Sequence, residues 1–166
     1  MAAPLPHVLT VCLDAVSTSL AGMSKGAGYR RDYKGVKRFA YDLPLEDDDA
    51  IPWVQMDIGD DEPERPEHSS AMHQVQEVFV QVHVKADKLS DGSSDIMTPV
   101  LEVAADIHQA VFANRSCGVS YAHIRQPTRR EVRPFGATLD AIGATLRVTY
   151  ELEYFHRSED MSLGPL

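Results

Sequence analysis

An alternating stretch near the middle of the chain limits the fold more than any other feature of the sequence. Between residues 78 and 86 every even position is apolar, while three of the four odd positions hold Gln81, His83 and Lys85. A period of two residues predicts a β-strand with one buried face and one wet face. Residues 146–154 repeat the pattern, because apolar or aromatic side chains there alternate with polar or charged ones. Two such strands need a common apolar cover.

Two segments have the helical spacing that supplies such a cover. Residues 6–23 place apolar side chains three and four positions apart, with Pro6 at the start and glycines beyond the end. The polar side of this segment carries no Lys or Arg, so we interpret its apolar stripe as a core face rather than a membrane-binding face. A second helix is predicted to end near Asn114, with Ser94 or Thr98 as its N-cap. Its apolar stripe is Ile96, Val100, Leu101, Ala104, Ile107, Val111 and Phe112.

Shorter elements fill the rest of the chain. Short strands are predicted over residues 36–42 and within residues 50–58. We interpret residues 59–70 as a loop, because the segment is acidic and contains two prolines. Residues 119–134 are predicted to form short strands around a turn at Gln126 and Pro127. In the strand within residues 50–58, one face is predicted to consist of Val54, Met56 and Ile58.

The order of these elements predicts an α+β fold, in which an antiparallel sheet has two main helices packed on one face, plus extended loops. We expect a single domain over residues 1–157, followed by a flexible tail at 158–166. The composition is that of an ordinary globular protein, with 43% hydrophobic and 25% charged residues. Neither Cys12 nor Cys117 belongs to a metal-binding spacing, so we expect a reducing compartment and no disulfide framework. No segment has the length of uninterrupted apolar residues that a membrane span requires.

Charge is distributed unevenly along the chain. The net charge of -9 argues against a body whose whole surface binds nucleic acid. Residues 25–38 nevertheless hold six of the 16 basic residues, and residues 42–67 hold eleven of the 25 acidic ones. The basic candidates for a contact site are Arg30, Arg31, Lys34, Lys37 and Arg38, and the acidic ones are Asp47, Asp48, Asp49, Asp60 and Asp61. A second basic group lies on the predicted strand arm and consists of Arg125, Arg129, Arg130 and Arg133.

Catalytic and ligand-binding motifs are missing from the sequence. The seven histidines do not form an HExxH pair, GxSxG is absent, and the glycines fit neither a P-loop nor GxGxxG. The acidic clusters lack the alternating ligands and central glycine of an EF-hand loop. We therefore expect no catalytic, cofactor or metal site, and a protein that is not an enzyme. A small hydrolase that uses His83 and nearby carboxylates stays open as an alternative.

Three segments carry a resemblance to a known family. They are AIPWVQMDIGDDE at 50–62, EVFVQVHVKA at 77–86 leading into the helix IMTPVLEVAADIHQAVF at 96–112, and the final strand GATLRVTYELEYFHR at 143–157. In pattern and order, from about residue 5 to residue 157, the chain resembles the tail terminator (tail completion) proteins of tailed phages and phage-derived particles. The likeness lies in the order of elements rather than in an invariant motif.

This resemblance implies a structural virion protein. Such proteins form a ring, typically a hexamer, on the head-proximal end of the tail tube, where they end tube polymerisation and provide the surface that joins the head. The implied partners are further copies of the chain, the tail tube protein, a neck or connector protein and, transiently, the genomic DNA in the channel. The implied location is the tail and neck of the virion, assembled in the host cytoplasm, with no membrane and no cofactor involved.

The separated charges suggest how such a ring would close. We hypothesise that the basic candidates in residues 25–38 face either the acidic loop of the next subunit or DNA in the channel. Neutralisation within the same subunit, or a solvated surface, is the alternative. Another head-tail connector protein, or a soluble α+β binding module with no phage role, also stays open at this point.

Overall fold

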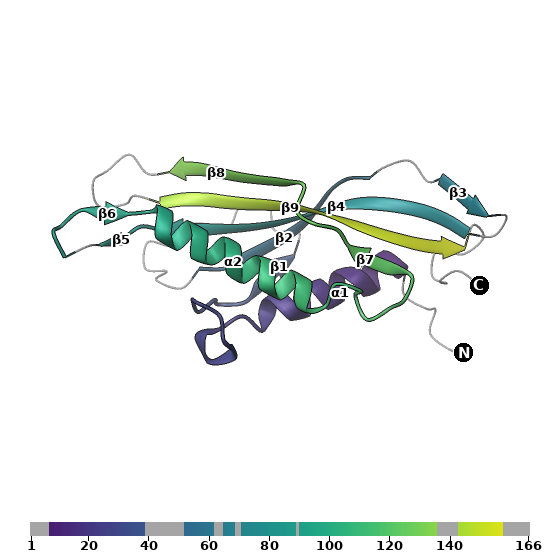
Figure 1. Cartoon of the computed structure of the whole chain (residues 1–166), viewed down its shortest axis with the longest axis horizontal. Coiled ribbons are helices and arrows are strands. Elements are labelled where there is room, and N and C mark those ends of the chain that lie inside the picture. The colour runs from purple at the N-terminus through teal and green to yellow at the C-terminus, as the bar shows by residue number, and fades with distance from the viewer. Residues whose placement is uncertain are drawn as a thin grey trace.

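Two long antiparallel strands form the centre of the fold (Figure 1). The computed structural model describes residues 7–38, 52–61, 65–68, 71–88, 90–135 and 143–157. Strand β4 (Ala71–Lys85) pairs with β9 (Gly143–Arg157) along the full length of both, and Val80 lies opposite Val148. This register places the even residues of both strands on one face. That face is buried from residue 74 to residue 84 of β4 and from residue 144 to residue 156 of β9, so the predicted alternation is confirmed.

One outer edge of this central pair belongs to β4. Both β2 (Val54–Asp61) and β3 (Arg65–His68) pair with that edge in antiparallel orientation, one after the other along its length. Strand β1 (Val36–Arg38) then pairs with β2 in parallel orientation. The main sheet is therefore mostly antiparallel, with one parallel pair at this edge.

The opposite edge belongs to β9 and carries the predicted strand arm. Strands β7 (Ala122–Ile124) and β8 (Arg129–Phe135) both pair antiparallel with β9, and the turn between them contains Gln126 and Pro127, as predicted. A separate hairpin of β5 (Asp87–Lys88) and β6 (Ser94–Asp95) extends beyond β4. Figure 1 shows this hairpin at one end of the elongated molecule, near the start of α2.

Both main helices lie on one face of the sheet, as the α+β prediction requires. Helix α1 (Val8–Ala21) contacts α2 (Met97–Ala113), and a short 3-10 turn, η1 (Lys25–Ala27), follows α1. Both helices pack on this face because their sequences are amphipathic, and each turns one apolar stripe toward the even face of the strands. The helical part of the core consists of Val8, Cys12, Leu13, Val16, Leu20, Val100, Val103, Ala104, Ile107, Ala110 and Val111.

The prediction of a loop over residues 59–70 is wrong for most of the described part of that segment. Strand β2 continues to Asp61, and residues 65–68 form β3. The physical reason is that the free edge of β4 offers backbone hydrogen bonds that local composition does not reveal. Pro66 is tolerated in β3, whose only pairing among the described strands is with β4, since an edge strand has one side without ladder bonds.

Ile58 lies on the same face as Val54 and Met56, as predicted, but its side chain is 37% exposed while theirs are buried. Two other details of the predicted elements differ from the structure. Leu101 is 56% exposed because the buried stripe of α2 passes through the neighbouring Val100 and not through position 101. The N-terminus of α2 is capped by neither predicted residue. Instead, Asp95 Oδ1 accepts hydrogen bonds from the backbone N–H groups of residues 97 and 98, at 2.9 and 3.3 Å.

Several predictions lie outside the described residues. These are the final part of the short strand predicted over 36–42, the acidic run around 46–49, the connection 136–142 and the tail 158–166. The side chains of residues 60 and 61 also lie outside the described set, although the backbone there belongs to β2.

Candidate functional site

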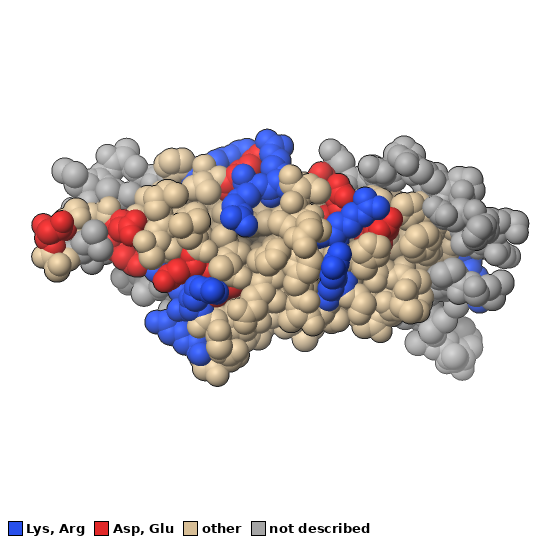
Figure 2. All heavy atoms as spheres, viewed as in Figure 1, with Lys and Arg blue, Asp and Glu red and all other residues tan. Residues whose placement is uncertain are grey.

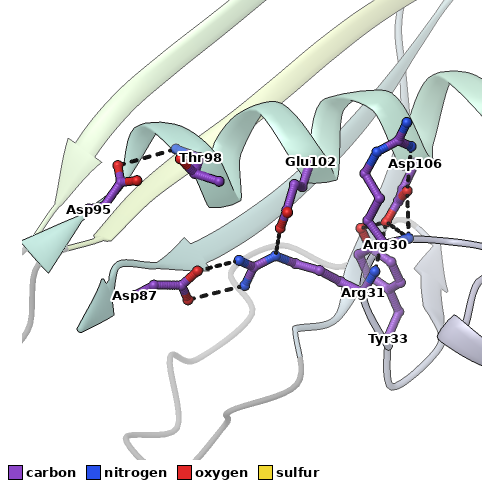
Figure 3. Close-up of polar contacts among 8 residues, drawn as sticks. All are labelled: Arg30, Arg31, Tyr33, Asp87, Asp95, Thr98, Glu102 and Asp106. Carbon is purple, nitrogen blue, oxygen red and sulfur yellow. Dashed lines mark hydrogen bonds and ion pairs between the residues drawn. The ribbon is translucent and has the colours of Figure 1, made fainter. Parts of the chain in front are cut away.

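The basic segment after α1 is held by a buried carboxylate on α2. Asp106 is fully buried, and it accepts the backbone N–H groups of Arg30 (3.0 and 3.1 Å) and Arg31 (3.1 Å). The Tyr33 hydroxyl donates to Asp106 Oδ2 at 3.0 Å, and Arg30 Nη1 lies 3.2 Å from Oδ1 (Figure 3). Burial and the negative charge of Asp106 both raise the pKa of Tyr33, so its hydroxyl stays protonated and donates. One carboxylate thus fixes the path of a whole loop.

Arg31 forms a second tie between the same elements. Its Nη2 lies 2.6 Å from Asp87 Oδ2, and its Nε lies 2.7 Å from Glu102 Oε2 (Figure 3). Burial alone would lower the pKa of Arg31, but the hydrogen bonds with the two carboxylates outweigh it, and the pKa rises. The guanidinium therefore stays charged and links the loop to α2 and to the β5–β6 hairpin.

The other basic candidates of this segment also contact their own subunit. Arg38 forms an ion pair with Asp14 of α1. The Lys37 ammonium lies 4.5 Å from the centroid of the Trp53 ring, within the range of a cation–π contact. The backbone N–H of Lys34 donates to a carbonyl oxygen at residue 52. For Arg30, Arg31 and Arg38 the structure thus provides the neutralisation within one subunit that the sequence left as an alternative.

The acidic candidates are not brought to this segment by any described contact. Asp47, Asp48 and Asp49 lie outside the described residues, as do the side chains of Asp60 and Asp61. The carboxylates that do meet the basic segment are at positions 14, 87, 102 and 106, which are spread over α1, α2 and β5. The burial of Asp106 could have been predicted from the sequence, because this residue lies on the buried stripe of α2, three residues after Val103 and one residue before Ile107.

The predicted arm divides its arginines between two environments. On β8, Arg129 and Arg133 both pair with Glu131, and their side chains are 71% and 74% exposed. Arg130 belongs to the opposite side of β8, because its partner in the ladder is the buried Val148. Three guanidiniums beside a single carboxylate leave this strand with net positive charge.

Arg125 takes part in a polar cluster on the sheet face opposite the helices. Its Nη2 lies 2.7 Å from Oε1 of Glu153, whose side chain is only 10% exposed. His73 Nε2 lies 2.6 Å from the same oxygen, and His123 Nε2 lies 2.8 Å from Oε2. The cluster connects β4, β9 and the segment around β7 through one carboxylate.

The electrostatics of Glu153 follow from these neighbours. Burial on its own would raise the pKa of this carboxyl, but hydrogen bonding to Arg125 and the positive charges nearby lower it. Glu153 is therefore ionised at neutral pH. Sequence reasoning missed the cluster because the two histidines and Glu153 are distant in the chain, and only the strand register brings them together.

Two concave surfaces border α2. A polar cleft of about 410 Å³ is lined by Lys25, Arg30, Arg31, Asp32, Pro52, Asp87 and Glu102. Its acidic and basic side chains are already paired across it, which leaves little net charge to attract a ligand. A second groove of about 300 Å³ lies between α2 and β8. Its lining is Arg30, Leu101, Ala104, Ala105, His108, Gln109 and Arg130.

The surface around the second groove carries exposed apolar side chains. Among the described residues, the large apolar side chains that are most exposed are Met97 (58%), Leu101 (56%) and Val132 (43%). Met97 and Leu101 are one helical turn apart on α2, and Val132 lies on β8 two residues after Arg130. Figure 2 shows an uncharged band over α2, with Lys and Arg side chains on both sides of it and acidic side chains next to them.

The histidine considered for hydrolysis has a simpler environment. His83 Nδ1 lies 2.7 Å from the hydroxyl of Thr145, its partner across the strands, and partial burial lowers the pKa of His83. Within the described part of the chain, no group of three or more His, Cys, Asp or Glu side chains is arranged to hold a metal ion. No helix in that part is long and apolar enough to cross a membrane.

Comparison with known proteins adds no assignment. No protein-family model matches the chain, and no curated protein matches it. The functional interpretation therefore rests on the sequence pattern and on the surfaces described above.

Proposed function

We propose that this protein is a tail terminator, a structural virion protein that forms a ring, a hexamer by analogy with its family, on the head-proximal end of a phage tail tube. In this role it ends tube polymerisation and provides the surface that joins the neck. The α+β fold supports the proposal, because the order of helices and strands is the one that the family resemblance implies.

The observation that carries the proposal is the difference between the two edges of the sheet. The β8 edge combines exposed apolar side chains with net positive charge, whereas the other edge is formed by β1 and β2, and the sequence that connects these two strands, residues 39–51, is strongly acidic. A subunit whose two sheet edges differ in this way favours head-to-tail association. Such an association closes into a ring when the rotation between neighbours allows it. Exposed apolar surface of this kind is typical of protein interfaces.

The candidate contact residues differ in how available they are to a partner. Arg30, Arg31 and Arg38 are balanced by carboxylates of their own subunit, so a contact with a neighbour or with DNA would have to compete with those pairs. Arg129 and Arg133 are far more exposed, and we propose them, rather than the segment 25–38, as the basic side chains available to a neighbour or to DNA.

Electron microscopy of tail tubes tests the function. Tubes would be polymerised from the tail tube protein encoded in the same genome, with and without this protein. The expected result is a ring with an open centre on one end of each tube, together with tubes that stop growing at the capped end. A protein that remains monomeric beside tubes, and leaves their growth unchanged, would refute the proposal and favour a binding module or an enzyme. Binding to the connector alone would favour another neck protein.

A further inference from the structure

The groove between α2 and β8 has the properties of a peptide-binding surface. Its floor is formed by the apolar side chains of Leu101, Ala104 and Ala105, and exposed Met97 and Val132 extend the apolar area along both walls. Burying such side chains against a partner is favourable, at about 25 cal/mol for each Å² of apolar surface removed from water. An occupant is therefore expected to bring apolar side chains of its own.

The rims of the same groove are basic. Arg130 reaches it from β8, and Arg30, whose charge is already balanced by Asp106, reaches it from the loop after α1 with a side chain that is 50% exposed. Among the described lining residues there is no Asp or Glu to balance Arg130. The fitting occupant is thus a segment that carries both apolar side chains and several carboxylates.

This chain contains a segment of that composition. Residues 42–51, with the sequence DLPLEDDDAI, combine Leu43, Leu45 and Ile51 with one acidic residue at position 42 and four consecutive ones at 46–49. The groove and this segment are complementary in charge and in apolar character. We propose that the groove between α2 and β8 receives residues 42–51 of a neighbouring copy of this chain, an inference that rests on the ring proposed above.

The topology favours a neighbour over the same copy as the source of the segment. The strands β1 and β2, which residues 42–51 connect in the sequence, lie at one edge of the sheet, and β8 lies at the opposite edge. Helix α1 contacts β1 and β2, and α2 contacts β4 and β9, so both helices lie between the first edge and the groove. In a head-to-tail ring, by contrast, opposite edges of adjacent subunits face each other.

Cysteine cross-linking tests this contact directly. One chain would carry Leu45→Cys and a second chain Leu101→Cys, and the two would be mixed with tail tubes under mild oxidation. The native Cys12 and Cys117 are buried and do not compete. A disulfide-linked dimer is expected on a non-reducing gel, and a ladder of higher species is expected when one chain carries both substitutions. Ser120→Cys, an exposed position beyond the end of α2, replaces Leu101→Cys as the control and should give no such product.

A pair of charge reversals gives an independent measurement. Arg130→Glu introduces repulsion inside the groove and should lower the oligomer population in sedimentation velocity by about tenfold or more. Lys25→Glu makes the same change of charge on an exposed side chain that does not line the groove, and should change that population by less than about twofold. Equal effects of both reversals would overturn the proposed contact.

The outcomes separate this inference from the proposed function. Rings on tube ends without the disulfide would overturn the contact and leave the tail terminator function standing. A ladder of disulfide-linked species on the gel, without capping of tubes, would support the contact and refute the function. A doubly substituted chain that cross-links only within its own monomer would overturn the contact, and the absence of any oligomer would refute both.

Discussion

Replacing Asp106 by asparagine tests whether one buried carboxylate holds the basic segment on α2. Asparagine has nearly the same size but only one acceptor oxygen. If that oxygen keeps the contacts of Arg30, the backbone N–H of Arg31 and the Tyr33 hydroxyl face the amide nitrogen instead. The hydroxyl can rotate and accept a hydrogen bond from the amide, whereas the N–H cannot.

The cost follows from the groups left without an acceptor. A buried donor that loses its partner costs about 1–3 kcal/mol. The ion pair with the half-exposed Arg30 adds less than about 1 kcal/mol, because solvent screens it. We therefore expect Asp106→Asn to lower the free energy of unfolding by about 2–3 kcal/mol, which corresponds to a melting temperature lower by roughly 4–12 °C for a chain of this size.

Urea denaturation followed by far-UV circular dichroism and by fluorescence measures the loss. Trp53 is the single tryptophan and contacts Lys37 of the basic segment, so its emission reports on the region concerned. The matched control is Glu102→Gln, one helical turn earlier on α2, where the ion pair with Arg31 is partly exposed and should contribute less than about 1 kcal/mol. If the two substitutions cost the same, the assignment of a special role to Asp106 is refuted.

Three further predictions concern other parts of the structure. Because the pKa of Glu153 is lowered in the fold, its stabilising effect is present above its ordinary value near 4.5 and is lost as the pH falls through the folded value. The difference in urea midpoint between wild type and Glu153→Gln should therefore shrink below about pH 4.5, and a constant difference would contradict this. Gly59→Ala should lower stability by about 1–3 kcal/mol, since a Cβ there would lie 2.2 Å from the ring of Phe79, and a neutral result in a thermal melt would count against that close approach. A hydrogen bond with Cys117, together with burial, raises the pKa of Cys12, so Ellman's reagent should label this thiol only after unfolding, and rapid labelling of the native protein would show the burial to be wrong.

The long elements of the fold could be predicted because each carries its periodicity locally. The alternation around Val80 and Val148 specifies two strands with a shared buried face, and the spacing within residues 6–23 specifies a helix. The α+β class follows from the order of these elements. Strand β3 was missed because it pairs, among the described strands, with the edge of β4, and the local sequence, which is charged and contains proline, does not indicate that partner.

In the candidate sites, too, the features that are local in the sequence could be predicted and those that depend on tertiary contacts could not. That Arg30 and Arg31 lie in a basic segment is visible in the sequence, but their partners come from three other elements and depend on tertiary structure. The cluster around Glu153 depends on strand register, which alternation alone does not determine, since a shift of two residues preserves the faces and changes every partner. Exposure of Leu101 depends on the rotation of α2 by a fraction of a turn, which is finer than an apolar stripe specifies.

The pairing of β4 with β9 also has a consequence for how the chain folds during synthesis. The two strands are separated by residues 86–142, so their ladder closes a large loop and makes long-range contacts dominate the fold. Until residues 143–157 leave the ribosome, β4 has an unpaired edge and its apolar face lacks the neighbour that completes the core. Chains arrested before that point would present a strand edge prone to pairing with other molecules, so the aggregation risk persists until residues 143–157 have emerged.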